Sequence, residues 1–328
     1  MVLVSHFWPR TEHASYSDFI VERMSFGVEI FFVVSGFLIT YLLLNEEQKH
    51  GSVSIANFYF RRFLRIVPPL YCYLLALIFL TATNYLITPT QDIFSSAFFL
   101  RNFFGTSSQT AHCWSLSVEE HFYLVWPCLF VMLGDNRLRL AFCLAIVLIS
   151  PFWSHWIYKL AGGAEYANNL RTDLRLSGIA FGSGLACTRF TQLGSKIFQS
   201  HWLTSGWTVL ATLVLVLSIS FTSLSSLPVL RAFAPTIASA GVAVLLNAAI
   251  ANARSWWVHV LDWQPVSLFG KMSYSIYLWQ QMFIPNSDNT EPNYTRHLVW
   301  LLAAVASGII AYWLIEKPMM RMRAIFRR

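Results

Sequence analysis

The sequence predicts an all-α, polytopic transmembrane helix bundle of about ten helices, the first of them truncated at its N-terminus. Of the 328 residues, 56% are hydrophobic and 12% are charged, whereas a soluble domain carries about 25% charged residues. Apolar runs recur along the whole chain and do not alternate with polar residues as the strands of a membrane barrel do. The 27 Phe, 13 Trp and 13 Tyr residues suit helices whose ends lie at membrane–water interfaces.

The apolar runs define the individual helices, because a helix needs about 20 residues to cross a bilayer. An apolar piece of about eight residues at the start of the chain is too short to cross. We expect it to be the outer end of a helix whose beginning is missing, or a segment in the interface. The remaining runs predict spans over 26–45, 68–88, 113–134, 138–158, 173–190, 203–221, 232–251, 264–284 and 297–316. No soluble domain is appended, so residues 1–328 are expected to form a single transmembrane domain.

The distribution of basic residues predicts the orientation. About two thirds of the 23 lysines and arginines lie in the loops after the second, fourth, sixth and eighth helices and in the tail, and such residues favour the cytoplasmic side. We therefore expect a multi-pass protein of the cell membrane, the inner membrane in a Gram-negative cell, with a cytoplasmic C-terminus. His6 and the loop around 89–112 then face outward. The net charge of +7 reflects this orientation and does not indicate a nucleic-acid partner.

The stretch HCWSLSVEEHFYLVWP, residues 112–127, places two glutamates inside an apolar run. An ionised side chain at the bilayer centre costs at least about 2.5–3.5 kcal/mol, so we interpret one of them as a catalytic or binding carboxylate that faces an internal cavity. Helical spacing lets only one of the two glutamates face a given cavity fully, because Glu120 and His121 point away from the face that contains Glu119. The alternative is that both glutamates lie in the aqueous interface. One helical face should contain Ser115, Glu119, Phe122, Tyr123 and Trp126.

Two further stretches carry charge beside apolar runs. Glu29, in SFGVEIFFVVSGFLIT, is either an interfacial charge or, with a partner within reach, a functional one. Ser35 and Gly36 in the same stretch are small enough for close helix contact. In NFYFRRFLRIVPPLY, a double proline is expected to end one element and start the next span. The arginines before it either anchor the cytoplasmic side or bind a phosphate-bearing cofactor: Arg61, Arg62 and Arg65.

Other motifs limit the chemistry. His6, in LVSHFWP, is a lone histidine and could be structural, but histidine is the usual general base near neutral pH. The sequence contains no HExxH, Walker loop, GxGxxG or GxSxG motif, so we expect no zinc protease, no ATP hydrolysis, no NAD binding of the usual kind and no nucleophile elbow. No metal site is expected. The small residues of SGIAFGSGLA, 177–186, indicate a helix contact.

Taken together and in order, six segments resemble the acyltransferase 3 family of polytopic membrane acyltransferases. They are LVSHFWP, GVEIFFVVSGFLIT, FYFRRFLRIVPP, WSLSVEEHFYLVWP, GKMSYSIYLWQ and IEKP, which span nearly the whole chain. The family usually has Asp at the position of Glu29 and Gln at that of His121. It also usually has an arginine about eleven residues before the histidine, a position that would precede residue 1.

The resemblance implies ten transmembrane helices and transfer of an acyl group, usually acetyl, from cytosolic acetyl-CoA or another acyl-CoA. Acceptors are hydroxyls of surface or secreted carbohydrates, including glycolipid precursors. By the same resemblance His6 is catalytic, Glu119 is essential, and Arg61, Arg62 and Arg65 contact CoA. Glu29, Ser115 and Tyr123 are supporting candidates. Because the arginines are expected at the cytosol and His6 toward the outside, either the pantetheine arm threads into the bundle or the acyl group is relayed.

These residues would act together in acyl transfer to a hydroxyl. His6 would serve as the base, and Glu119 would orient it or stabilise its protonated form. Two alternative functions use the same residues differently. A transporter or flippase would employ the intramembrane acids as proton or substrate sites, and an inactive, truncated homologue would only bind a partner.

Overall fold

The computed structural model describes residues 27–160, 170–191, 205–221, 228–284 and 294–325, together with Leu3, Phe7, Gly194, Lys196 and Ser200. All regular secondary structure within these residues is helical, which confirms the predicted all-α class. The long helices are α3 (Gly27–His50), α4 (Ile55–Ala82), α6 (Cys113–Leu133), α7 (Asn136–Leu160), α8 (Thr172–Arg189), α11 (Gly206–Phe221), α12 (Pro228–Ala251), α14 (Gln264–Trp279) and α15 (Tyr294–Ala311). The short ones are α5 (Thr90–Ala97), η2 (Ser108–Thr110), α13 (Trp256–Asp262), η5 (Gln280–Phe283), η6 (Tyr312–Glu316) and α16 (Lys317–Ile325).

Six helical segments are long and apolar enough to cross a membrane: Gly27–His50, Ile55–Ala82, Ser108–Leu133, Asn136–Leu160, Ala232–Ala251 and Thr295–Met322. Three other predicted spans, 173–190, 203–221 and 264–284, correspond to helices of 18, 16 and 16 residues. The first of these, α8, contains the charged residues Asp173, Arg175 and Arg189. The protein is thus a multi-pass helical membrane protein, and the count of about ten helices stays a prediction.

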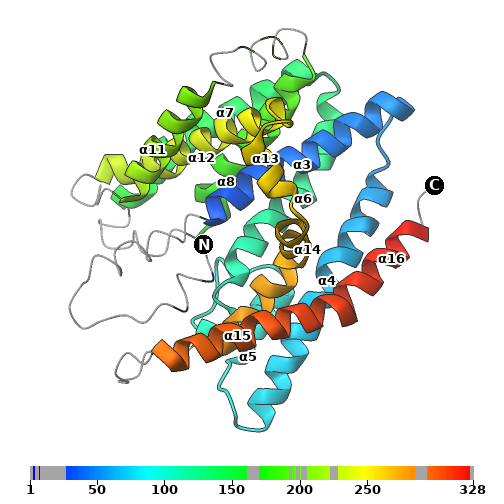
Figure 1. The fold of residues 1–328 in the computed structure, drawn as a ribbon, viewed down its shortest axis with the longest axis vertical. Coiled ribbons are helices and arrows are strands. Elements are labelled where there is room, and N and C mark those ends of the chain that lie inside the picture. Colours follow the sequence, from blue (N-terminus) through cyan, green and yellow to red (C-terminus); the bar gives the residue numbers. More distant parts are fainter. Residues whose placement is uncertain are drawn as a thin grey trace. The chain divides into compact units, whose positions relative to one another are not determined.

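The chain divides into two compact units, which are described one at a time. Unit 1 comprises residues 1–25, 54–117 and 261–328, and its main helices are α4, α14 and α15. Unit 2 comprises residues 26–53 and 118–260, and contains α3, most of α6, α7, α8, α11 and α12. Figure 1 shows the course of these helices along the chain. The expectation of one domain over residues 1–328 stays a prediction.

In unit 2, α8 is the central helix and packs against α3, α7 and α12. Its small residues allow the α3 backbone to come very close. A Cβ added at Gly182 would collide with the Val33 carbonyl, and one added at Gly36 would collide with the Ile179 carbonyl. The contacts predicted from SGIAFGSGLA and from Gly36 are therefore confirmed.

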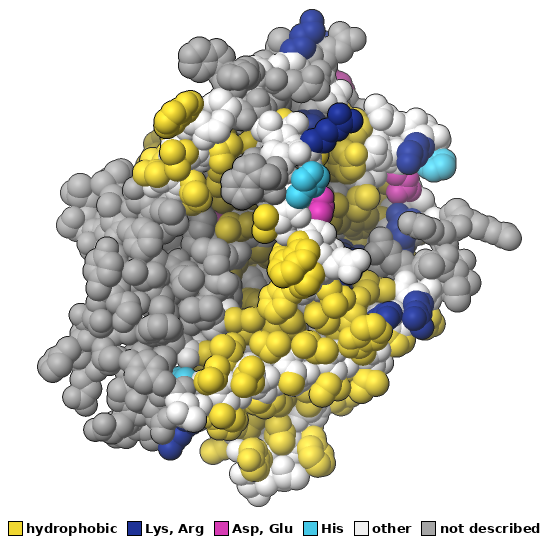
Figure 2. All heavy atoms as spheres, in the orientation of Figure 1, with side chains coloured by type: hydrophobic (Ala, Val, Ile, Leu, Met, Phe, Trp, Pro, Cys, Tyr) yellow, Lys and Arg dark blue, Asp and Glu magenta, His cyan; other side chains and the backbone are white. Residues whose placement is uncertain are grey.

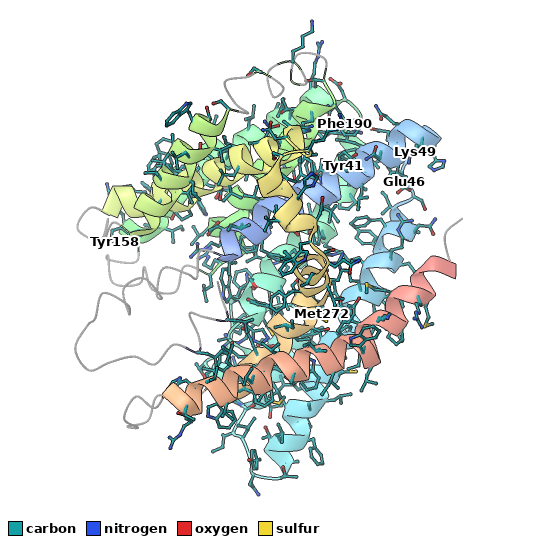
Figure 3. The ribbon with its side chains drawn as sticks, viewed as in Figure 1. Tyr41, Glu46, Lys49, Tyr158, Phe190 and Met272 are labelled. Atoms are coloured by element: carbon teal, nitrogen blue, oxygen red, sulfur yellow. The ribbon has the colours of Figure 1, made fainter. Side chains whose placement is uncertain are left out.

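Polar and aromatic contacts hold the far end of α3 within the same unit. Arg139 of α7 is buried and makes a bidentate ion pair with Glu47 of α3, with N–O distances of 2.6 and 2.7 Å. Its guanidinium lies 3.5 Å from the centroid of the Phe130 ring. Tyr41 of α3 and Phe190, which follows α8, lie side by side with ring centroids 5.7 Å apart (Figure 3). These contacts fix the position of α3 at its C-terminal end.

In unit 1, α4 corrects one expectation from the sequence. Pro68 and Pro69 do not separate two elements but lie inside a single helix of 28 residues. The prolines remove the donors to the carbonyls four residues earlier, but neighbouring helices in a membrane can tolerate this. Tyr274 of α14 donates a hydrogen bond of 2.9 Å to the Ile66 carbonyl nearby.

The outer surface of unit 1 is apolar along α15. Figure 2 shows hydrophobic side chains over this helix, and Leu298, Val299, Leu302 and Ile310 are all more than half exposed. Such a surface suits a helix that faces lipid, because lipid tails solvate apolar side chains that water would not.

The contact between α3 and α8 predicts a large effect from a small substitution. Gly182→Ala places a methyl group against the Val33 carbonyl, so we expect a loss of about 1–3 kcal/mol in the free energy of unfolding, measured by SDS-induced unfolding in mixed micelles. Gly270→Ala is the matched control, because nothing lies within 4 Å of a Cβ there. Equal stability of the two variants would contradict the proposed contact.

Candidate functional site

Glu119 is a buried carboxylate in unit 2, with only 4% of its surface exposed. It accepts a hydrogen bond of 2.7 Å from the Tyr123 hydroxyl, one turn along α6. It also accepts one from the hydroxyl of Ser35 on α3, and the Ser35 and Tyr123 hydroxyls contact each other. Two hydroxyl donors lower the cost of burying a carboxylate, because hydrogen bonds to an ionised group are stronger than neutral ones.

The surrounding face of α6 agrees with the predicted helical spacing. The five residues expected to share that face are all buried, whereas Glu120 and His121 are half-exposed. His121 contacts the Thr172 hydroxyl through Nδ1 at 2.7 Å. The burial of Glu119 does not fit the alternative in which both glutamates lie in the aqueous interface.

Trp126, two turns after Glu119 on α6, connects α6 to α3. Its indole N–H donates a hydrogen bond of 2.9 Å to the Thr40 hydroxyl, and both residues are buried. The ring stacks on Phe122, with centroids 5.4 Å apart. Because Thr40 and Ser35 belong to the same helix, this contact fixes how α3 is positioned along α6, and so where Ser35 meets Glu119.

Glu29 has the partner that a functional interpretation requires. It is buried at the start of α3 and forms an ion pair with Arg175 of α8, with an N–O distance of 2.8 Å. The Ser239 hydroxyl of α12 donates a further hydrogen bond of 3.3 Å. Three helices of unit 2 thus meet at one charge pair, in which Glu29 is buried and Arg175 is half-buried.

The three arginines proposed to contact CoA lie on α4 in unit 1. Arg61, Arg62 and Arg65 are all half-buried, and Arg61 and Arg65 are one turn apart. The charge of Arg65 interacts with that of Glu316, a buried residue that accepts a hydrogen bond of 2.5 Å from the Ser275 hydroxyl. The arginines and Glu119 belong to different units.

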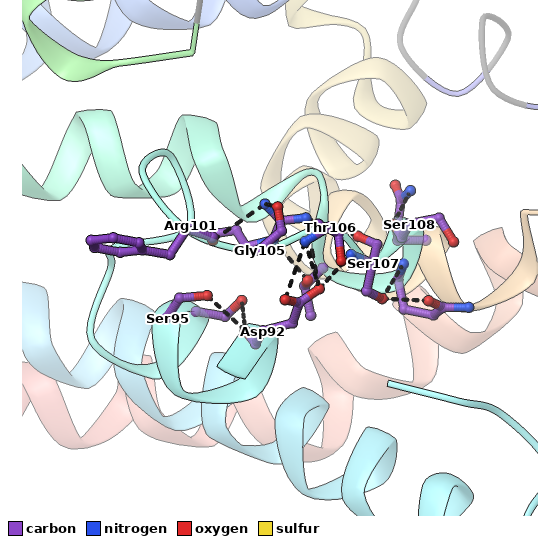
Figure 4. A network of polar contacts seen from close by, with 12 residues as sticks. Asp92, Ser95, Arg101, Gly105, Thr106, Ser107 and Ser108 are labelled. Carbon is purple, nitrogen blue, oxygen red and sulfur yellow. Dashed lines mark hydrogen bonds and ion pairs between the residues drawn. The ribbon is translucent and has the colours of Figure 1, made fainter. Parts of the chain in front are cut away.

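The loop between α5 and α6 has an ordered polar network that the sequence analysis did not identify (Figure 4). The Arg101 guanidinium donates to the Thr110 hydroxyl at 2.8 Å and to the carbonyls of Gly105 and Ser107 at 3.0 and 2.9 Å. Asp92 lies 4.0 Å from that guanidinium and accepts hydrogen bonds from backbone N–H groups of the same loop. Burial lowers the pKa of Arg101. The sequence signals were the polar run GTSSQT and Gly105, whose φ of +118° favours glycine.

Ser115, a supporting candidate, lies in unit 1 near the start of α6. Its hydroxyl is 2.7 Å from that of Tyr277 on α14. Tyr277 also donates to the His112 carbonyl at 3.0 Å. Ser115 is therefore part of a contact between the start of α6 and α14.

Two expectations concern residues or groups for which the structure gives no geometry. His6 lies outside the described residues, so its role stays a prediction. Within the described part of the chain, no group of three His, Cys, Asp or Glu side chains could hold a metal ion.

Long apolar helices with two buried carboxyl groups, one of them paired with an arginine, define a polytopic membrane protein with an intramembrane polar site. A family model described as an acyltransferase domain, that of the acyltransferase 3 family, matches residues 1–316. The chain belongs to this family.

The relatives that the chain matches include O-acetyltransferases. The chain is 27% identical over 322 residues to the peptidoglycan O-acetyltransferase OatA of Listeria monocytogenes, covering 89% of this chain and 50% of the relative. It is 25% identical over 336 residues to the O-acetyltransferase OatA of Staphylococcus aureus, covering 89% and 52% respectively. The chain therefore spans about half the length of these relatives. No solved structure matches it.

The Glu29–Arg175 pair predicts a measurable coupling energy. Arg175→Ala leaves the buried Glu29 carboxylate without its cation, so we expect a loss of about 3–5 kcal/mol in the free energy of unfolding. The double variant Glu29→Gln/Arg175→Met should recover part of it, because no uncompensated charge remains buried. SDS-induced unfolding in mixed micelles measures both.

Arg171→Ala provides the control for this comparison. Arg171 pairs with Asp173 at 2.9 Å, but the two side chains are 45% and 35% exposed, so we expect a loss of no more than about 1 kcal/mol. An equal loss in Arg171→Ala and Arg175→Ala would contradict the special role of the buried pair.

Proposed function

We propose that this chain is a membrane O-acyltransferase that moves an acetyl group from acetyl-CoA to a hydroxyl of a cell-wall or surface carbohydrate. Membership of the acyltransferase family supports acyl transfer, and the peptidoglycan O-acetyltransferases among its relatives support a cell-wall acceptor. A glycolipid precursor of that carbohydrate fits the same chemistry, because it presents the same hydroxyls. No metal takes part in the proposed reaction.

The buried Glu119 carboxylate is the observation that carries this proposal. An anion in a membrane interior is costly, and here two hydroxyl groups from two helices are arranged around it. A carboxylate held in this way has a fixed position, which it needs in order to orient a neighbouring base and, when ionised, to stabilise the protonated form of that base.

In the proposed reaction, His6 takes the proton from the acceptor hydroxyl, and Glu119 orients the imidazole. The acceptor oxygen attacks the thioester carbonyl carbon, the carbon–sulfur bond breaks, and the proton passes by way of His6 to the leaving CoA thiolate. The Tyr123 hydroxyl supports Glu119 and fixes the orientation of its carboxylate.

Arg61, Arg62 and Arg65 are proposed to bind the phosphates of CoA. Arginine presents a planar fork of donors that matches phosphate oxygens, and three such residues on one helix supply enough positive charge for several phosphates. Glu316, which interacts electrostatically with Arg65, would then help to orient the cluster. We propose a cytoplasmic C-terminus in the cell membrane, on the basis of the positive-inside distribution.

Glu119→Gln tests the role of the carboxylate. The substitution keeps the shape and an acceptor oxygen but removes the charge, so we expect acetyl transfer to fall by about 10²–10⁴-fold with the fold preserved. The assay measures CoA release from acetyl-CoA by the protein in nanodiscs, with soluble peptidoglycan fragments as acceptor. Tyr123→Phe removes one hydrogen bond to the carboxylate and should cost about tenfold.

Glu120→Gln is the matched control, since the neighbouring carboxylate is half-exposed and on another side of α6. We expect near-wild-type CoA release from it. Equal losses in Glu119→Gln and Glu120→Gln, or full activity in Glu119→Gln, would exclude the proposed role of Glu119.

Neutralising the α4 arginines tests the CoA site. Arg62→Gln should raise KM for acetyl-CoA about 10–100-fold, as expected for the loss of a charge-assisted hydrogen bond. Acetyl-pantetheine, which carries no phosphate, should be used equally by wild type and variant. Arg137→Gln removes an exposed charge elsewhere and serves as the control. A similar loss with both donors would indicate a structural role for Arg62.

A further inference from the structure

A short polar segment at the end of α14 lies within unit 1 and has no role in the mechanism above. The helix changes at Trp279–Gln280 into the 3₁₀ turn η5, Gln280–Phe283. Trp279, Gln280 and Gln281 follow one another at this change, and both glutamines are buried. A run of polar side chains inside a membrane protein is unusual unless the groups have partners.

Gln280 has none within the part of the chain that the structure describes. Its side chain is 0% exposed, and neither its amide nitrogen nor its amide oxygen is hydrogen-bonded there. The Trp279 indole nitrogen and the Gln281 amide oxygen are also buried without a described partner. The Gln281 amide nitrogen donates to the Ser108 carbonyl at 2.6 Å, which holds η5 against the ordered loop. Each such group costs about 1–3 kcal/mol when left unsatisfied, so the cluster requires an explanation.

A chain of aromatic rings begins at Trp279 in this segment. Tyr73 of α4 lies in T-shaped contact with Trp279 and with His112, with centroids 5.7 and 5.5 Å apart. His112 in turn contacts the Tyr277 ring at 5.4 Å. The two tyrosine hydroxyls donate to backbone carbonyls, Tyr73 to Gln109 at 2.7 Å and Tyr277 to His112 at 3.0 Å. The hydrogen bonds therefore hold these rings in place beside Trp279 and His112.

The unsatisfied groups define the chemistry of a ligand. They comprise donors, on the Trp279 indole and the Gln280 amide, and acceptors, on the Gln280 and Gln281 amides. All of these groups are uncharged, so they match a neutral molecule that both donates and accepts hydrogen bonds. Adjacent hydroxyls of a sugar do both, and the apolar faces of a sugar ring pack against aromatic side chains. A few polar groups among aromatic walls is the usual composition of a small-molecule site.

We propose that Trp279, Gln280 and Gln281 bind a sugar ring of the carbohydrate acceptor, an inference that rests on the proposed function. The site lies entirely within unit 1 and uses none of the residues assigned to catalysis or to CoA.

Thermal unfolding of the protein in nanodiscs, without acetyl-CoA, tests the site directly. The probe is a soluble pentamer of N-acetylglucosamine. We expect it to raise the unfolding midpoint of the wild type and to leave that of Gln280→Met unchanged. Without ligand, Gln280→Met should unfold at a higher temperature than the wild type, because it removes an unsatisfied buried amide while nearly keeping its volume. A stabilised variant that no longer binds sugar cannot be explained by misfolding.

Asn247→Leu is the matched control. Asn247 is a buried amide in unit 2 that accepts a hydrogen bond of 2.7 Å from Arg189. Its replacement should lower the unfolding midpoint and leave the sugar-dependent rise intact. A wild type without any sugar-dependent rise, or an equal rise in Gln280→Met, would overturn the site; the second result would indicate that the amides are satisfied by water.

CoA release separates this inference from the proposed function. In a transfer assay, Gln280→Met should raise KM for the oligosaccharide at least about tenfold, with acceptor-independent hydrolysis of acetyl-CoA unchanged. If the wild type transfers acetyl groups and Gln280→Met binds sugar normally, the proposed function stands and the proposed sugar site is excluded. If the wild type transfers no acetyl groups but its unfolding midpoint rises with sugar in a Gln280-dependent way, the proposed function is excluded and the sugar site stands.

Discussion

The close approach of α3 and α8 is the constraint on which the polar architecture of unit 2 depends. With glycine at positions 36 and 182, the backbones meet almost without side chains between them. This contact fixes α3 along its length. Glu29 then meets Arg175 near the start of the helix, and Ser35 faces Glu119 in its middle. Any residue larger than glycine would move both polar contacts together.

The protein contains two kinds of buried polar group, one in unit 2 and one in unit 1. Glu119 and Glu29 are carboxyl groups that accept hydrogen bonds from neighbouring donors, so the cost of burying them is offset within the protein itself. Gln280 is neutral and its amide has no described partner, so its cost is offset only when something else binds. The first arrangement fixes the position of a carboxyl group, and the second leaves hydrogen-bonding groups for the proposed ligand.

Helices and helix faces could be predicted from the sequence, because apolar length and 3.6-residue spacing are local properties. That is why the buried face of α6 was predicted correctly and why six spans coincide with apolar runs. The double proline was wrongly predicted to separate two elements. A helix tolerates an internal proline through its neighbours in the fold, and the local sequence does not show them. Ser35 and Arg175 could not be identified as partners, since they lie 84 and 146 residues from Glu119 and Glu29. The lack of a partner at Gln280 is likewise a property of packing alone.

The charged residues of α3 also bear on how the protein is made. Glu47 pairs with a residue 92 positions later in the chain, and Glu29 with one 146 positions later. At a synthesis rate of about 5–20 residues per second, Glu29 waits roughly 7–30 s for its arginine. A helix with an unpaired carboxylate is costly to release into lipid. We therefore expect α3 to remain beside the insertion machinery until α8 has been synthesised. Membrane insertion of the two helices would then be cooperative.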